Sequence, residues 1–113
     1  MDTKINRKVK CLESLIVDME YRKFPLRQII LFGSFSTNNF HERSDLDLCL
    51  IHDDGREPTC TEKVAIESYV DSHVGEEMNV DFLYATPIKL ENGRQVFDSI
   101  RKEGLILWQH SGI

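Results

Sequence analysis

Two short apolar runs that lie close together in the sequence constrain the fold more than any other feature. The first run is QIILF at 28–32 and ends in Gly33-Ser34, and the second is LDLCLI at 46–51. Each has the length and composition of a buried β-strand. Only about a dozen residues separate them, too few for a full crossover helix, so we expect the two strands to pair antiparallel.

Helical periodicity flanks this pair of strands. The first helix is predicted from apolar residues at steps of three and four, and it ends before Pro25; its apolar face comprises Ile5, Val9, Leu12, Ile16 and Met19. A second helix is predicted after 52–58, with Thr59 or Thr61 as its cap. Its apolar stripe is Ile66, Val70 and Val74, and Gly75 is placed to end it.

The last third of the chain predicts two more strands around a helical stretch. MNVDFLYA at 78–85 reads as the third strand, Thr86-Pro87 opens a helix, and Asn92-Gly93 interrupts the early part of that helix. Gly104 ends the stretch, and 105–108 reads as a fourth strand. The expected fold class is α+β, a small mixed β-sheet with helices packed on it, in a single domain over residues 1–113.

Composition narrows the classes of partner and compartment. The formal net charge is −5, which argues against direct nucleic-acid binding, because affinity for phosphates comes from a basic surface. Cys11, Cys49 and Cys60 are three scattered cysteines, which fit neither a disulfide framework nor structural zinc. No apolar stretch reaches membrane-spanning length, so we expect a cytoplasmic protein without a membrane segment.

Asp45 and Asp47 are the first candidates for chemistry. Residues two apart in a strand point to the same face, so both carboxylates lie on one face and Leu46 and Leu48 on the other. Paired carboxylates repel each other unless a cation is present or one is protonated. Mg²⁺ prefers such oxygen ligands, although a solvent-facing edge with incidental acids remains the alternative.

Gly33-Ser34 and Asp81 extend this candidate site. A glycine lets a nucleotide phosphate approach the backbone, and Ser34 offers a hydroxyl and an N–H, although Gly-Ser is also an ordinary turn. Asp81 stands between Val80 and Phe82, which should face the core. If its strand pairs with the strand of Asp45 and Asp47, three carboxylates converge, a set that can hold two divalent ions.

Together these residues resemble the DNA polymerase β-like nucleotidyltransferase superfamily, and in particular its minimal nucleotidyltransferase domains. The shared pattern is a strand ending in Gly33-Ser34, ten intervening residues, Asp45-Leu46-Asp47 on the next strand, and a third acid at Asp81. The closing segment from Ala85-Thr86-Pro87 to Trp108 is similar to the ending of the small members. The resemblance covers nearly the whole chain.

The resemblance implies a role for each residue of the pattern. Gly33 and Ser34 would hold the β- and γ-phosphates of ATP, and Asp45 and Asp47 would bind the Mg²⁺ ion that grips the triphosphate. Asp81 would join them at a second Mg²⁺ and help to activate the attacking hydroxyl. The three acids would therefore be both metal-binding and catalytic, and AMP would be transferred with release of pyrophosphate.

The resemblance also implies a partner and leaves an alternative open. Small members of this kind are commonly encoded beside a helical HEPN protein, often an RNase toxin, and some attach AMP to it as its antitoxin. Thr37 stands where family members often carry an arginine that touches the triphosphate. A catalytically weak or inactive nucleotide- or protein-binding module, which neutralises its partner by contact, therefore remains the second hypothesis. The base preference and the oligomeric state, including a homo-oligomer, stay open.

Overall fold

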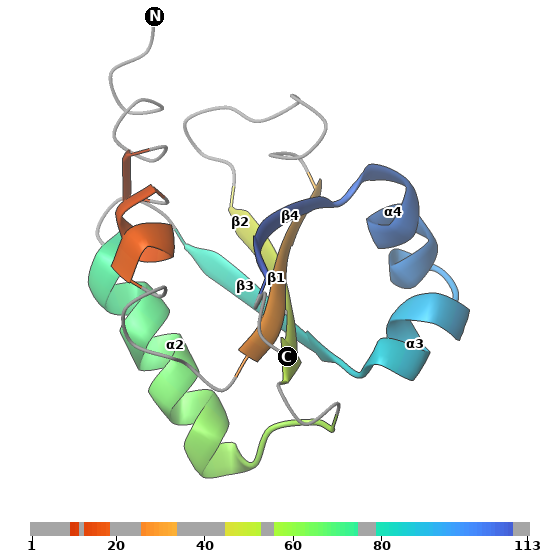
Figure 1. Cartoon of the computed structure of the whole chain (residues 1–113), viewed down its shortest axis with the longest axis horizontal. Coiled ribbons are helices and arrows are strands. Elements are labelled where there is room, and N and C mark those ends of the chain that lie inside the picture. Colours follow the sequence, from red (N-terminus) through yellow and green to blue (C-terminus); the bar gives the residue numbers. More distant parts are fainter. Residues whose placement is uncertain are drawn as a thin grey trace, which may run out of the picture.

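The computed structural model describes residues 10–11, 13–18, 26–33, 45–52, 56–74 and 79–109. Within them a four-stranded mixed sheet has the order β3-β2-β1-β4. The strands are β1 (Leu26–Phe32), β2 (Leu46–His52), β3 (Val80–Ala85) and β4 (Leu105–Gln109). Figure 1 shows the sheet in the middle of the molecule, with α2 on one side and α3 and α4 on the other. The expected fold class is confirmed.

The connections between strands set their directions. β1 and β2 pair antiparallel, as their short spacer predicts, and β4 pairs antiparallel with the other side of β1. β2 and β3 pair parallel because α2 (Cys60–Val74) carries the chain back to the starting end of β2. β2 lies between β1 and β3 and is buried almost throughout, which explains its continuous apolar run.

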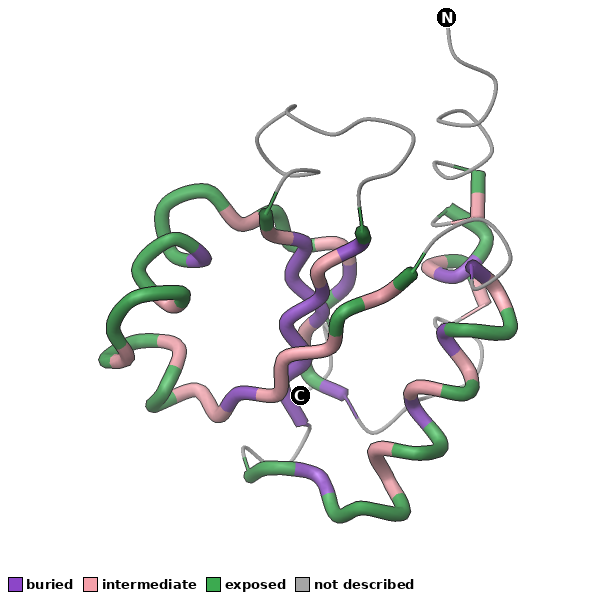
Figure 2. Tube along the Cα trace, turned by 180° about the vertical axis from the view of Figure 1, so that it is seen from behind, coloured by how far each residue is buried: buried purple, intermediate pink, exposed green. Residues whose placement is uncertain are grey.

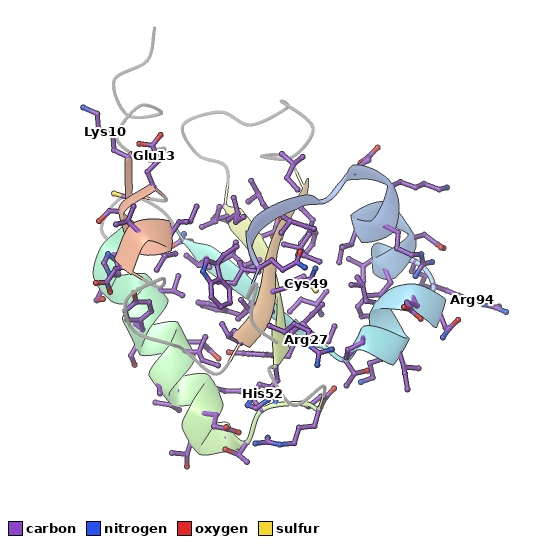
Figure 3. All side chains as sticks on the ribbon, in the orientation of Figure 1. Lys10, Glu13, Arg27, Cys49, His52 and Arg94 are labelled. Atoms are coloured by element: carbon purple, nitrogen blue, oxygen red, sulfur yellow. The ribbon has the colours of Figure 1, made fainter. Side chains whose placement is uncertain are left out.

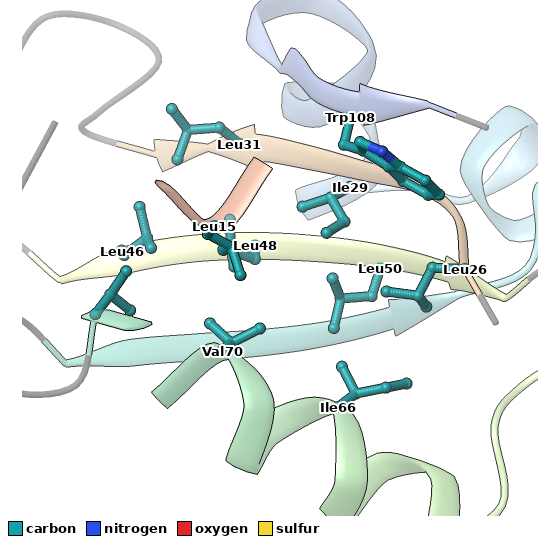
Figure 4. Packing of buried hydrophobic residues seen from close by; sticks show 11 residues of the cluster. Leu15, Leu26, Ile29, Leu31, Leu46, Leu48, Leu50, Ile66, Val70 and Trp108 are labelled. Atoms are coloured by element: carbon teal, nitrogen blue, oxygen red, sulfur yellow. The ribbon is translucent and has the colours of Figure 1, made fainter. Parts of the chain in front are cut away.

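Alternation along the strands divides the core between the two faces of the sheet. Leu46, Leu48 and Leu50 pack on the α2 face with Ile66, Val70 and Val74, the predicted stripe of that helix. Figure 4 shows this cluster, which also includes Ile29 and Trp108. Cys49, Ile51 and Ala85 pack on the opposite face with Ile100 of α4. Helices therefore cover both faces of the sheet. On each face they cover the part where the side chains of the strands are apolar.

Helix α2 begins with a reciprocal cap. Thr59 Oγ1 accepts from the N–H of Glu62 at 3.2 Å, and the Glu62 carboxylate accepts from the N–H of Thr59 at 2.8 Å. This is a capping box, which satisfies two N–H groups that the helix leaves without an internal partner. Thr59 is thus the cap, and the alternative at Thr61 lies inside the helix.

The helical stretch after β3 is two helices rather than one. α3 (Pro87–Asn92) begins at Thr86, whose hydroxyl accepts from the N–H of Lys89, and it ends at Gly93. α4 (Val96–Glu103) follows after Gln95, which has a φ of 58°. The predicted interruption at Asn92-Gly93 is therefore a complete break, and the sharp turn lets α3 and α4 lie side by side (Figure 1).

The helical residues 13–18 correct one part of the sequence analysis. Leu15, which the predicted stripe omits, is buried, whereas Ile16 of that stripe is only half-buried and Val17 is exposed. Leu15 and Cys11 lie one turn apart and both contact the cluster on the α2 face. The rest of the predicted stripe, Ile5, Val9, Leu12 and Met19, lies outside the described residues. Within the described ranges, no helix is long and apolar enough to cross a membrane.

Candidate functional site

The acids and the apolar residues of β2 and β3 share one face of the sheet but occupy different ends of it. On the face of α3 and α4, Asp45, which directly precedes β2, and Asp47 come before Cys49 and Ile51. β3 repeats this order, with Asp81 ahead of the apolar Leu83 and Ala85. α3 and α4 cover the apolar end. The acidic end is left open among the described residues, with Asp45 and Asp81 exposed.

The strand register brings Asp47 and Asp81 side by side. They are direct partners in the parallel β2–β3 ladder, and a backbone hydrogen bond of 2.8 Å from Leu46 N–H to Asn79 O fixes the start of that ladder. Their side chains lie close enough for Asp81 to raise the pKa of Asp47 through its charge and through a side-chain hydrogen bond. The convergence expected of Asp81 with the other acids therefore depends on β3 running parallel to β2.

Gly33 completes the same end of the sheet from the side of β1. Phe32 is the β1 partner of Asp47, so Gly33 follows directly beside that aspartate. Gly33 has a φ of 74°, and a Cβ at this position would collide with the Oδ2 atom of Asp47. Glycine thus serves two purposes here: it adopts the left-handed backbone and leaves space for the carboxylate. Ser34, Thr37 and Arg43 lie outside the described residues.

The surroundings of Asp47 raise the pKa of its carboxyl group above the ordinary value. Burial is the largest cause, followed by the negative charge of Asp81, the hydrogen bond with Asp81 and the charge of Asp45. All of these favour the protonated form of Asp47. A cation beside the acids would reverse the balance, since it would favour the charged carboxylates.

The donor chemistry of this end fits a hard divalent cation, because every candidate ligand is a carboxylate oxygen. Within the described ranges, however, no group of three or more His, Cys, Asp or Glu side chains is arranged as a metal site. A bound Mg²⁺ would take its remaining ligands from phosphate oxygens and water, as this ion usually does. Burial raises the pKa of the neighbouring Cys49 thiol to about 11, so Cys49 is a core residue and not a nucleophile.

A second polar cluster lies at the other end of β2, and the sequence analysis did not find it. His52 is buried, and its Nε2 atom lies 3.0 Å from Oε2 of Glu62, which also accepts from Arg56 at 2.9 Å. Figure 3 shows His52 at the end of the sheet beside the start of α2. The pKa of Glu62 is lowered, first by its hydrogen bond with Arg56 and then by those with the Thr59 N–H and His52. The spacing Thr-x-x-Glu at 59–62 was the available signal.

A third cluster joins the helical residues 13–18 to α2. Asp18 accepts a hydrogen bond from the Tyr69 hydroxyl, and its Oδ2 atom lies 3.4 Å from Nε2 of His73. An open pocket of about 670 Å³ lies beside it, lined by Lys10, Glu13, Ser14, Val17, Asp18 and His73. None of the predicted site residues lines this pocket. The cluster is best understood as packing between two helices.

Comparisons with known proteins agree with this arrangement. The family model described as "Nucleotidyltransferase domain" matches residues 15–106. Among solved structures, a toxin–antitoxin complex with AMP-PNP matches at 21% identity and a TM-score of 0.54, over 94% of this chain and 73% of that chain. A putative nucleotidyltransferase from Sulfolobus solfataricus matches at 18% identity and a TM-score of 0.57, over 97% and 90% of the two chains.

A further solved structure, the toxin–antitoxin MntA-HepT, matches at 17% identity and a TM-score of 0.52, over 88% of this chain and 71% of that chain. A comparison with curated proteins finds no significant match. At these identities the solved structures establish the fold. The family model, which spans most of the sequence, establishes the family.

Proposed function

The chain belongs to the nucleotidyltransferase domain family, and on this premise we propose that it transfers AMP from ATP to a hydroxyl group of a partner protein. One observation carries the proposal: Asp47 and Asp81 are register partners on the open end of a sheet face, beside Gly33. Two neighbouring carboxylates repel each other, and a bound cation would relieve that repulsion.

The proposed roles follow from the positions of the residues. Gly33 and Ser34 bind the β- and γ-phosphates, and Asp45, Asp47 and Asp81 hold up to two Mg²⁺ ions. When bound, Mg²⁺ supplies positive charge that offsets the charge of the phosphates. The acceptor oxygen forms a bond to the α-phosphorus, the bond from that phosphorus to the bridging oxygen breaks, and pyrophosphate leaves with the electron pair. Asp81 accepts the proton of the hydroxyl.

The proposed partner is a helical HEPN-type protein in the cytoplasm, for which this chain is the antitoxin. Two of the three solved structures described above are toxin–antitoxin complexes, and one of these contains AMP-PNP. The alternative is a module that silences its partner by contact alone. It is favoured by Thr37, which stands where an arginine often touches the triphosphate.

A transfer assay separates the two functions. The chain is mixed with labelled ATP, Mg²⁺ and a co-expressed HEPN-type protein, and the label on that protein is measured. We expect transfer by the parent chain and by the control Asp71→Asn, an exposed aspartate on α2. The double variant Asp45→Asn, Asp47→Asn should transfer nothing and should no longer silence the partner. Intact silencing by the double variant would establish the contact mechanism instead.

A further inference from the structure

The sheet order places three candidate groups in a row across the open end of the sheet. Asp81 is on the edge strand β3, Asp47 is its partner on β2, and Gly33 follows the β1 residue that pairs with Asp47. Adjacent strands are about 4.8 Å apart, so the row crosses from β3 through β2 to the end of β1 over neighbouring strands. The two ends of the row differ, because β3 is an edge strand of the described sheet and β1 is an inner strand.

This direction matters for an in-line displacement, in which the attacking and leaving oxygens lie on opposite sides of the phosphorus. With the β- and γ-phosphates at Gly33, pyrophosphate leaves towards β1. The acceptor hydroxyl must then approach from the opposite side, past Asp81. That approach crosses the outer edge of β3, where no further strand follows in the described sheet.

Every second residue of β3 directs its backbone N–H and C=O groups away from β2, towards the outer edge of the sheet. The Leu46 N–H bonds to Asn79 O, so the peptide groups of Asn79 and of every second residue after it face β2. The N–H and C=O groups of Val80, Phe82 and Tyr84 therefore face outwards. Such a row is a template for an added strand.

The side chains of β3 are also only partly covered. Val80, Phe82 and Tyr84 on the α2 face and Leu83 on the other face are all half-buried, whereas the apolar residues of β2 are fully buried. In Figure 2, which views the molecule from behind, β3 runs in front of the other strands. An added strand would place its own side chains beside those of β3 on both faces, as β1 does beside β2.

We infer that the acceptor hydroxyl is carried on an extended segment of the partner protein, which pairs with the outer edge of β3 as a fifth strand. This inference rests on the proposed function and adds the side and the manner of acceptor binding. A hydroxyl side chain on that segment, opposite Asp81, gives up its proton to the Asp81 carboxylate as its oxygen bonds to the α-phosphorus. Pyrophosphate leaves on the β1 side.

Hydrogen exchange of individual amides tests the inference on the unmodified chain. The probe is the HEPN-type protein of the transfer assay, added with Mg²⁺ and α,β-methylene-ATP, whose bridge between the α- and β-phosphates cannot be cleaved. We expect the outward amides of Phe82 and Tyr84 to exchange at least about tenfold more slowly in the complex. The amides of Asp81 and Leu83, which already bond to β2, serve as internal controls. Protection of β4 amides, with β3 unchanged, would overturn the inference.

Two variants at Val80 test the inference by their rates of AMP transfer. Val80→Pro removes an outward N–H at the first residue of an edge strand, a place that tolerates proline, and Val80→Thr keeps the N–H and the branched shape. We expect Val80→Pro to bind Mg²⁺–ATP normally and to lose about tenfold or more in transfer rate, while Val80→Thr transfers normally.

A control on the opposite edge uses Leu105→Lys, at a residue of β4 that is 51% exposed, and this variant should transfer normally. Equal transfer by Val80→Pro and Val80→Thr, with a loss in Leu105→Lys, would move the acceptor to β4. If the parent chain transfers no AMP, the proposed function itself fails, which is a different outcome from a parent that transfers and variants that do not differ.

Discussion

The surroundings at the two ends of β2 shift the pKa of a carboxyl group in opposite directions. At its start, Asp47 faces Asp81 and Asp45, and burial together with their negative charge raises the pKa of Asp47. Just beyond its end, Glu62 accepts hydrogen bonds from Arg56, the Thr59 N–H and His52, and the pKa of Glu62 is lowered. The carboxylate of Glu62 has hydrogen-bond partners inside the chain, whereas Asp47 faces other acids, for which we propose a cation from outside. A carboxyl group whose pKa is raised by neighbouring acids marks a candidate binding site, whereas one whose pKa is lowered by internal partners is typical of a structural residue.

The largest expected effect is on transfer. Asp47→Asn should lower the rate of AMP transfer by about a hundredfold or more, equivalent to ~2.7 kcal/mol, because it removes a charge that holds the metal and the phosphates. Glu62→Gln should leave the rate within about twofold, since Glu62 lies at the other end of β2. Single-turnover assays with labelled ATP measure both. A large loss in Glu62→Gln would mean that the two ends are coupled.

The next effect concerns the space at Gly33. Gly33→Ala places a methyl group against Oδ2 of Asp47 and forces alanine into a φ of 74°, which costs about 1 to 2 kcal/mol for the backbone alone. We expect a lower free energy of unfolding in urea and weaker binding of Mg²⁺–ATP by calorimetry. The Asp47→Ala background supplies the control, because there only the cost of the backbone should remain. An equal cost in both backgrounds would remove the collision as a cause.

Glu62→Gln should lower stability through the lost charge on a residue that accepts from three partners. Because the folded pKa of Glu62 lies below the ordinary value of about 4.3, its contribution is present above that pH. It is lost as the pH falls through the folded pKa. The parent and Glu62→Gln should therefore differ at neutral pH and converge in acid. The pH dependence of urea unfolding measures this, with Glu91→Gln on α3 as an exposed control; a constant difference would contradict it.

The smallest expected effect is on stability at the end of β2 that carries Asp47. Its dependence on pH has the opposite sign to that of Glu62. The folded pKa of Asp47 is raised, so its contribution is favourable below the ordinary value of about 3.9 and is lost as the pH rises through the folded pKa. Without metal, Asp81→Asn should be at least as stable as the parent above that range, by up to about 1 kcal/mol.

Mg²⁺ should remove this advantage by stabilising the parent. At ten times its Kd the ion adds about 1.4 kcal/mol to the free energy of unfolding. Thermal unfolding with and without MgCl₂ compares the two chains. A clear loss of stability in Asp81→Asn without metal would assign Asp81 a structural role.

The sequence predicted the strands and helices well because their signals are local. The runs at 28–32 and 46–51 correspond to β1 and β2, and the stripe at Ile66, Val70 and Val74 is buried as expected. The ends differ by one or two residues; β1 begins at Leu26 and β2 continues through His52. His52 extends the strand because a side chain brought from α2, Glu62, binds its ring. Such a partner cannot be seen in the local pattern.

The candidate site was predictable as a set of residues, but not as an arrangement. The alternation of Asp45 and Asp47 with leucines places both acids on one face, a rule that holds for any strand. The pairing of Asp47 with Asp81 depends on the parallel return through α2 and on the hydrogen bond from Leu46 to Asn79. The collision that excludes a side chain at Gly33 likewise depends on tertiary structure. The functional roles of all these residues stay predictions.

The place of β1 in the sheet has a consequence for the order of folding. β2 follows β1 closely in the sequence, but the other neighbour of β1, β4, lies far along the chain. The side chains of Gln28 and Gln109 are hydrogen-bonded although 81 positions separate them. Closing so long a loop is slow, because its entropy is lost before the contacts form. We expect the strands that carry the acids to assemble first and β4 to dock last. Pulse-labelled hydrogen exchange during refolding would show this as late protection of the amides of β4, and early protection there would contradict it.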